Sequence, residues 1–273
     1  MEKDLSPKKA YNNLEFLNSP EARTIRILSE FYEPKARFEK ENIQDTIVFF
    51  GSARLLSGKD AAANLNAVKE NQDKNTYEYA VNLKKAEKLV EMSHYYDEAE
   101  ELAQRLTKWS STLPGNGKRL TVCSGGGPGV MEAANKGAFQ AGGKSIGLNI
   151  SIPFEQFVNT YVPNELAFEF HYFFMRKFWF VYLAKALIVF PGGFGTLDEM
   201  MEVLTLIQTK KVTKHIKIIV YDSNYWKKVI NFDALAESGM ISPEDMNILD
   251  FCDTIDEVYE KITKSFENNF LHD

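Results

Sequence analysis

Two glycine-rich turns hold the residues of this 273-residue chain whose types and spacing best suit chemistry. One runs from Ser124 to Gly129 and the other from Pro191 to Thr196, and each follows a β-like run and opens a helix-like segment. In an open α/β sheet, ligands lie outside the carboxyl ends of the strands, where helix N-termini offer free N–H donors and positive dipole ends. Both turns therefore suit a phosphate group, although glycines in either turn could also serve only to make a tight connection.

Glu199 is a carboxylate on the wrong side of its predicted helix. On a helical wheel it falls between Leu206 and Val203, whereas the other polar side chains of this helix gather in one arc. Its position favours a catalytic role, because carboxylates with altered pKa values concentrate in clefts. The alternative is a capping box, since Thr196-x-x-Glu199 fits that pattern.

Arg176 lies in a predicted helix, residues 172–185, that is apolar almost all round. Such a helix is buried in a core or an interface, and a charge within it is costly unless it is paired. The partner of Arg176 could be a phosphate or Glu199 itself. Lys177 is more easily explained as a cation that extends to solvent from the helix start. Glu132, near the first glycine turn, is most simply an exposed pair with Lys136.

Short β-branched or aromatic runs alternate with helix-like segments and must position these residues. Their apolar character on both faces predicts a parallel sheet covered by helices on both sides, a doubly wound Rossmann-like α/β fold. The predicted strands are 46–51, 119–124, 145–150, 186–190 and 216–221.

The chain divides into a helical extension over residues 1–45 and a single Rossmann-like domain over residues 46–273. In the extension, helical spacing continues from Ser19 until Pro34, which is expected to end the helix. Residues 55–75 lack clean periodicity and are interpreted as an insertion, flexible or weakly helical.

The composition is that of an ordinary globular protein, with 44% hydrophobic and 26% charged residues and a net charge of −6. No apolar stretch is long enough for a membrane span and no leader is visible, so a cytoplasmic protein is expected. The mild acidity argues against nucleic-acid binding. Two cysteines and four scattered histidines predict neither a disulfide scaffold nor a metal site. Val130 stands where a dinucleotide fingerprint needs its third glycine, so no nicotinamide cofactor, and no cofactor at all, is predicted.

An ordered set of motifs resembles the Lonely Guy family, whose members are often labelled lysine decarboxylase-like. The resemblance covers roughly residues 46–221. The segments that carry it are Gly51-Ser52-Ala53-Arg54, the first glycine turn with Val130-Met131-Glu132, Phe173-Phe174-Met175-Arg176-Lys177, and the second glycine turn with Leu197-Asp198-Glu199.

This resemblance implies hydrolysis of the N-glycosidic bond of nucleoside 5′-monophosphates, such as AMP or cytokinin nucleotides, to free base and ribose 5-phosphate. It implies that Glu199 and Arg176 are the catalytic pair. It also implies a homodimer or larger homo-oligomer with sites near the subunit interface. The predicted substrate-binding residues are Ser52, Gly126, Gly127, Met131, Glu132, Lys177, Gly192, Gly193, Gly195 and Thr196.

One departure concerns base specificity, because many family members have Met-His-x-Arg-Lys where this chain has Phe173-Phe174-Met175-Arg176-Lys177. The alternative function is a non-catalytic nucleotide or molybdenum-cofactor carrier of the same fold. The presence of both Arg176 and Glu199 favours the enzyme. Lysine decarboxylation is disfavoured, since no lysine sits in a recognisable pyridoxal phosphate setting.

Overall fold

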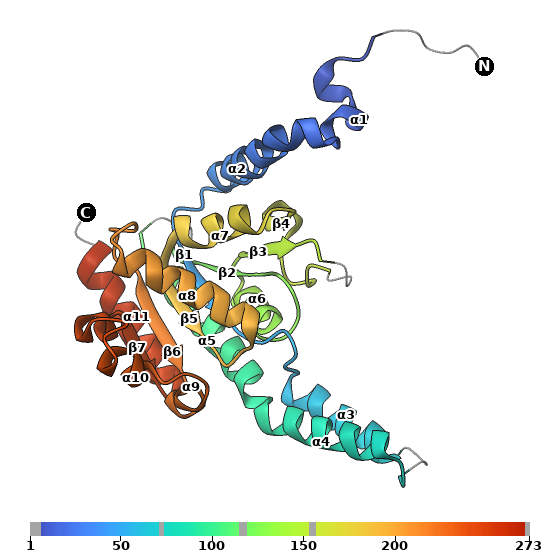
Figure 1. The fold of residues 1–273 in the computed structure, drawn as a ribbon, viewed down its shortest axis with the longest axis vertical. Helices are drawn as coiled ribbons and strands as arrows, with labels where there is room; N and C mark the ends of the chain where they lie inside the picture. Colours follow the sequence, from blue (N-terminus) through green and yellow to red (C-terminus); the bar gives the residue numbers. More distant parts are fainter. Residues whose placement is uncertain (1–6, 71–73, 115–118, 153–156, 271–273) are drawn as a thin grey trace.

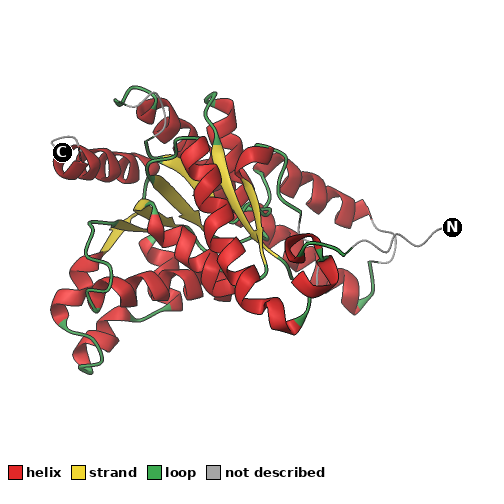
Figure 2. Cartoon of the chain, turned by 90° about the horizontal axis from the view of Figure 1, so that it is seen from above, coloured by secondary structure: helices red, strands yellow, loops and turns green. Residues whose placement is uncertain are grey.

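The computed structural model describes residues 7–70, 74–114, 119–152 and 157–270. Their core is a seven-stranded sheet of order β4-β3-β2-β1-β5-β6-β7, in which every neighbouring pair is parallel. Helices cover both faces (Figure 2), so the predicted doubly wound α/β fold is confirmed. The strands are β1 Thr46–Phe50, β2 Thr121–Ser124, β3 Ser145–Ile150, β4 Ala167–Phe170, β5 Ala184–Val189, β6 Lys217–Tyr221 and β7 Leu249–Cys252.

The α-helices of the described residues are α1 Leu14–Leu17, α2 Arg23–Lys40, α3 Gly58–Glu70, α4 Tyr77–Met92, α5 His94–Ser110, α6 Val130–Gln140, α7 Phe173–Tyr182, α8 Phe194–Gln208, α9 Ser223–Val229, α10 Phe232–Glu237 and α11 Ile255–Phe270. Four short 3₁₀ helices accompany them: η1 Ala10–Asn12, η2 Pro20–Ala22, η3 Asn164–Leu166 and η4 Pro243–Ile248.

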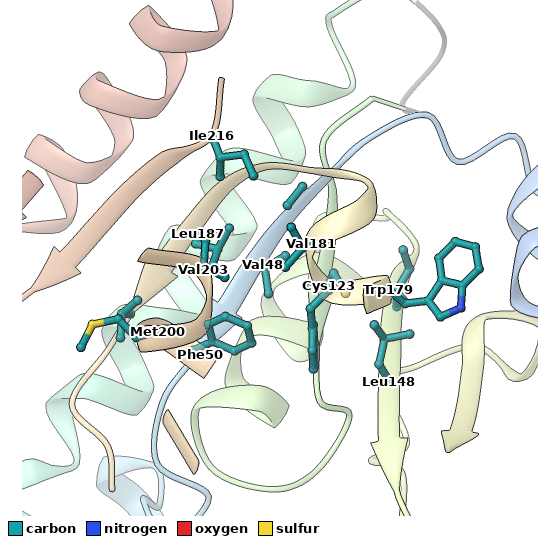
Figure 3. Packing of buried hydrophobic residues seen from close by; sticks show 14 of the residues in the cluster. Val48, Phe50, Cys123, Leu148, Trp179, Val181, Leu187, Met200, Val203 and Ile216 are labelled. Atoms are coloured by element: carbon teal, nitrogen blue, oxygen red, sulfur yellow. The ribbon is translucent and has the colours of Figure 1, made fainter. Parts of the chain in front are cut away.

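The sheet separates two hydrophobic clusters. Side chains of α7 and α8, including Trp179 and Met200, pack on one face of the strands (Figure 3). Helices α5, α6 and α11 cover the other face. Because burying apolar side chains is worth about 25 cal/mol per Å², strands apolar on both sides are held between two helical layers, as their sequence predicts.

The chain reverses direction across the sheet between β1 and β5. It runs outward from β1 through β2 and β3 to β4, then returns to β5 and continues to β7 on the other side. The segments that leave β1 and β5 therefore diverge, although Ser52 N–H still donates to the Pro191 carbonyl over 3.1 Å. Such a switch point is where open α/β sheets bind their ligands.

The two edge strands, β4 and β7, are absent from the sequence prediction. Each is only four residues long, and β4 alternates buried with exposed side chains, in contrast to the fully buried central strands. An edge strand has one unpaired side and less burial, so its sequence lacks the continuous apolar run that marks the others.

Pro34 does not end the N-terminal helix, and that expectation is wrong. Helix α2 continues through Pro34 to Lys40. A proline removes one N–H, which leaves the carbonyl four residues earlier without its helical partner. That carbonyl belongs to Glu30, and it accepts a hydrogen bond of 2.9 Å from the Trp179 indole of α7. A tertiary contact therefore satisfies the group that the proline leaves unpaired.

The Glu30 side chain also joins the N-terminal segment to α7. Its carboxylate accepts from the backbone N–H groups of His171 (2.8 Å) and Tyr172 (3.2 Å), at the start of that helix. A negative charge is favourable at this end of a helix dipole. Residues 1–6 of the predicted extension lie outside the described part of the chain.

Within the predicted insertion, residues 58–70 form helix α3, which packs against α4 as a helical hairpin. The hairpin extends away from the sheet (Figure 1). At its base, the Gly58 N–H lies 3.3 Å from a carboxylate oxygen of Asp97 on α5. Residues 71–73 lie outside the described residues.

No α-helix in the described ranges is long and apolar enough to cross a membrane. Within the same ranges, no cluster of three or more His, Cys, Asp or Glu side chains could hold a metal ion; His272 lies outside them. Cys123 and Cys252 are both free and buried.

Candidate functional site

A cavity of about 1130 Å³ opens at the switch point of the sheet. Its walls come from the segments after β1, β2 and β5, from α7 and α8, and from the last turns of α4. Eight of the predicted site residues line it: Ser52, Met131, Arg176, Gly192, Gly193, Gly195, Thr196 and Glu199. The volume is slightly above the range of about 300–1,000 Å³ that is usual for small-molecule sites.

The second glycine turn presents the N-terminus of α8 to this cavity. Helix α8 begins at Phe194 with Gly193 as its N-cap, and the Leu197 N–H makes a helical bond of 3.0 Å to the Gly193 carbonyl. The N–H groups before Leu197 precede that ladder and are free to meet an anion. A Cβ added at Gly193 or Gly195 would meet nothing within 4 Å, so this turn is open to a ligand.

Gly192 is needed for packing within the same turn. A Cβ at this position would lie 2.1 Å from Thr196 Oγ1, and the Gly192 carbonyl accepts a hydrogen bond of 2.8 Å from the Tyr225 hydroxyl. Tyr225 itself lines the cavity. The Thr196 side chain and the Tyr225 hydroxyl thus fix the turn from two sides.

The first glycine turn is mainly a packing turn. Gly126 has φ of +70°, and a Cβ there would come within 3.0 Å of the Gly147 backbone. The carbonyls of Gly126 and Gly127 accept hydrogen bonds from the Asn159 side-chain amide over 3.0 and 3.1 Å. Neither glycine is among the residues that line the cavity, whereas Gly125 and Met131 are.

Glu132 lies outside the cavity lining as well. The expected pair with Lys136 is not formed, because Glu132 accepts from the Tyr96 hydroxyl at 2.9 Å and Lys136 pairs with Glu100 at 2.9 Å. Helix α5 packs directly on α6 and supplies both partners, so contacts between helices replace the pairing along one helix.

Arg176 and Glu199 form an ion pair inside the cavity. Arg176 Nη2 lies 3.1 Å from Glu199 Oε1, and both side chains are largely buried. The guanidinium also lies over the rings of Phe180 and Phe173, 5.2 and 5.8 Å from their centroids. Glu199, one of the two partners that the sequence left open for Arg176, therefore lies in contact with it.

The capping alternative for Glu199 is wrong. Because α8 starts at Phe194, Thr196 is its third residue rather than its N-cap, and the Gly193 cap makes no side-chain hydrogen bond. Glu199 therefore lies in the second turn of the helix, and its carboxylate meets Arg176. Glu199 is therefore a buried residue of the cavity wall and does not cap the helix.

Burial raises the pKa of the Glu199 carboxyl above its ordinary value. The positive charges of Arg176 and Lys177 act against this rise, and the nearby Asp198 and Glu202 add to it. Desolvation disfavours the charged form of a carboxyl group, and the shift brings the group closer to the range in which a general base works well at neutral pH.

Replacing Arg176 by Met is expected to raise the pKa of Glu199 further, because the largest opposing effect on that carboxyl is lost. NMR titration of ¹³C-labelled glutamate side chains, with the resonance assigned by its loss in Glu199→Gln, measures this. Arg176→Lys keeps a positive charge and should shift the pKa less. An unchanged pKa in Arg176→Met would contradict the electrostatic coupling.

Lys177 forms ion pairs with carboxylates other than that of Glu199. Its ammonium lies 2.8 Å from Asp198 and 2.7 Å from Glu202, both on α8. It is not among the cavity-lining residues. Within the described chain, Lys177 therefore ties α7 to α8, which holds Arg176 and Glu199 in register.

Five polar residues that line the cavity were not predicted from the sequence: Arg54, Lys85, Lys88, Asn149 and Tyr225. The lysines lie on α4, beyond the segment interpreted as an insertion, and both are exposed. A lysine on an amphipathic helix is ordinarily a solvated side chain, so no local signal marks these two. Arg54 follows Ser52 directly in the first motif and could have been included.

Comparison with known proteins agrees with the motifs. A family model described as "Possible lysine decarboxylase" matches residues 131–262. The cytokinin riboside 5′-monophosphate phosphoribohydrolase LOG3 of Arabidopsis thaliana is 29% identical over 181 residues, which is 62% of this chain and 75% of that protein. The probable cytokinin riboside 5′-monophosphate phosphoribohydrolase LOGL3 of Oryza sativa subsp. japonica is 33% identical over 79 residues, 29% of this chain and 37% of that protein.

Among solved structures, the chain is similar to the molybdenum cofactor binding protein of Rippkaea orientalis, with a TM-score of 0.48 and 17% identity over 81% of this chain and 98% of that one. It is also similar to the Moco carrier protein of Chlamydomonas reinhardtii, with a TM-score of 0.47 and 14% identity over 82% and 99% of the two chains.

The family model covers the residues from Met131 through Arg176 and Glu199 into α11. The chain is thus similar to proteins of the Lonely Guy family, and the model that it matches carries the description of possible lysine decarboxylases.

Proposed function

We propose that this chain hydrolyses the N-glycosidic bond of nucleoside 5′-monophosphates, AMP-like or cytokinin nucleotides, releasing free base and ribose 5-phosphate. The observation that carries the proposal is that one cavity contains both the open N-terminus of α8 and the buried Glu199–Arg176 pair. The names of the similar plant proteins, which are phosphoribohydrolases, support the same reaction.

The α8 N-terminus would bind the 5′-phosphate through the N–H groups around Gly193, Gly195 and Thr196. Glu199 follows within the same helix, so the element that anchors the phosphate also sets the position of the carboxylate. Binding energy from the phosphate would then orient a bond that lies away from it. Ser52 and Met131, from the other side of the switch point, complete the walls.

Glu199 would stabilise the oxocarbenium character that develops on the ribose as the glycosidic bond breaks. The bonding electron pair leaves with the base. A water molecule loses a proton to the carboxylate and forms the new bond to C1′. The departing base takes up a proton from solvent, and the carboxyl group releases its proton to solvent, which restores the carboxylate. The positive charge of Arg176 favours the ionised form of the carboxylate, opposing the effect of burial, and the 3.1 Å contact fixes its orientation.

Incubation of the purified chain with AMP, GMP, CMP and isopentenyladenosine monophosphate, followed by chromatography of the free base, tests this function. Base release with an equal amount of ribose 5-phosphate is the expected result. Failure to release base from any of the four would overturn the proposal. Recovery of a bound nucleotide intact after long incubation would favour the carrier alternative.

The residues present do not fit the decarboxylase label. Lysines that form Schiff bases are activated by desolvation or a neighbouring cation. The two lysines that line the cavity, Lys85 and Lys88, are exposed on α4, and Lys88 pairs with Glu91 over 2.6 Å.

We also propose that the protein is a homodimer. Phe194, at the rim of the cavity, is 92% exposed, and Phe173, Phe174 and Tyr182 of α7 are each 52% exposed. Large apolar side chains left exposed near a site are typical of a protein interface. Light scattering of the purified chain should give twice the monomer mass.

A further inference from the structure

The end of α4 forms a wall of the cavity that the motifs do not cover. Lys85, Leu89 and Met92 lie at intervals of four and three residues, on one face of the helix, and all three line the cavity. Arg54, from the segment after β1, lines it too. The hairpin of α3 and α4 thus returns to the site at its base while its tip extends away from the sheet (Figure 1).

Two of the four cationic side chains that line the cavity are paired with carboxylates. Arg176 is paired with Glu199, and Lys88 is paired with Glu91. Just outside the lining, Lys177 is paired with Asp198 and Glu202. Arg54 and Lys85 differ from these, because their side chains make no ion pair with any acidic group in the described ranges of the chain.

A phosphate monoester needs more positive charge than a helix end supplies. It carries roughly −1.5 to −2 at neutral pH, whereas a helix N-terminus contributes about +0.5. The Glu199 carboxylate in the same cavity adds repulsion, and the chain as a whole carries a net charge of −6. The remaining charge must come from cations that are not occupied by other partners.

We propose that Arg54 and Lys85 bind the 5′-phosphate of the substrate together with the N-terminus of α8. This assignment rests on the proposed nucleotide substrate and makes the α3–α4 hairpin part of the substrate site. Binding there would discriminate nucleotides from nucleosides, because a ligand without the phosphate gains nothing from either cation.

The alternative for Lys85 is an ordinary solvated cation. Its neighbour Lys84 provides the matched comparison, since it lies on the same helix, has the same charge and is exposed, but is not among the cavity-lining residues. Successive residues of a helix point about 100° apart. Replacing either lysine by alanine therefore changes the net charge by the same amount, but only Lys85 lines the cavity.

The test compares Lys85→Ala, Arg54→Ala and Lys84→Ala. For AMP, we expect KM to rise about tenfold in each of the first two variants, the effect of losing one charge-assisted hydrogen bond, with a smaller change in kcat. Lys84→Ala should match the unmodified chain, and Lys85→Arg should restore most of the affinity. Thermal unfolding of each variant checks that the fold is retained.

Calorimetric binding of ribose 5-phosphate and of ribose separates this assignment from the proposed reaction. Weaker binding of ribose 5-phosphate in Lys85→Ala and Arg54→Ala, but not in Lys84→Ala, would support the phosphate site even in a chain that cleaves no nucleotide. Equal affinities in Lys85→Ala and Lys84→Ala would overturn it, even if AMP were hydrolysed. An unmodified chain that binds no ribose 5-phosphate would overturn it as well.

Discussion

If Glu199 is the general base of the proposed nucleotide hydrolysis, Glu199→Gln is expected to lower kcat by about 10²–10⁴-fold, while the chain stays folded. Glutamine has nearly the same shape, and its amide oxygen can still accept the hydrogen bond that Arg176 Nη2 donates. It cannot take a proton from water or offset positive charge on the ribose. Steady-state kinetics with AMP, together with circular dichroism, measure both parts of this prediction.

Stability should change little in this variant, because two effects oppose each other. Burial raises the pKa of Glu199, so the folded state holds this carboxyl's proton more tightly than the unfolded chain does. Stability from this group is thus present below its unfolded pKa and is lost as pH rises through the folded pKa. Glutamine removes that loss at neutral pH but also removes the charge that faces Arg176.

Glu202→Gln is the matched control for Glu199→Gln. Glu202 lies on the same helix, and its carboxylate pairs with Lys177 instead of lining the cavity. Its replacement should leave kcat within a few-fold of the unmodified chain. Near-normal turnover by Glu199→Gln would show that its buried carboxylate does not carry the chemistry.

Gly129→Ala is expected to destabilise the fold by about 2–6 kcal/mol, from backbone strain of about 1–3 kcal/mol and overpacking of similar size. Gly129 has φ of +70°, and a Cβ there would lie 2.2 Å from the Ser52 carbonyl oxygen. That carbonyl also accepts the Val130 N–H at 3.1 Å. A side chain at residue 129 would therefore force apart the segments that follow β1 and β2.

Gly142→Ala separates the two causes of this loss. Gly142 has φ of +76°, but a Cβ there would meet nothing within 4 Å, so only the backbone strain applies, about 1–2 kcal/mol. Chemical denaturation of both variants measures the difference. Equal losses in Gly129→Ala and Gly142→Ala would mean that the close approach to Ser52 is relaxed at little cost.

Features that depend on local sequence could be predicted. The central strands can be recognised in the sequence as short apolar runs, because both of their faces are buried. The two glycine turns follow β2 and β5, and parallel strands bring their carboxyl ends to one edge. Glu199 stood out because its helix period placed a charge on the apolar side, and it is indeed only 6% exposed.

Features that depend on contacts between residues far apart in the chain could not be predicted from the sequence. From the sequence, Pro34 is expected to end its helix. The helix continues because the Trp179 indole, 145 positions along the chain, donates a hydrogen bond to the carbonyl of Glu30. The sequence predicts that Arg176 has an oppositely charged partner, but it does not show whether that partner is a phosphate or Glu199. The residues around Lys85 do not indicate that it lines the cavity, because the sequence pattern of an exposed lysine is the same on any helix surface.

The sequence by itself determined the sheet, the glycine turns and the need of Arg176 for an opposite charge, because helix and strand periods and the cost of burying a charge act over a few residues. The tertiary structure decided which groups meet: Arg176 with Glu199, the Glu30 carbonyl with the Trp179 indole, and α4 with the cavity. These contacts join residues far apart in the chain, and their geometry is set only when the helices pack on the two faces of the sheet.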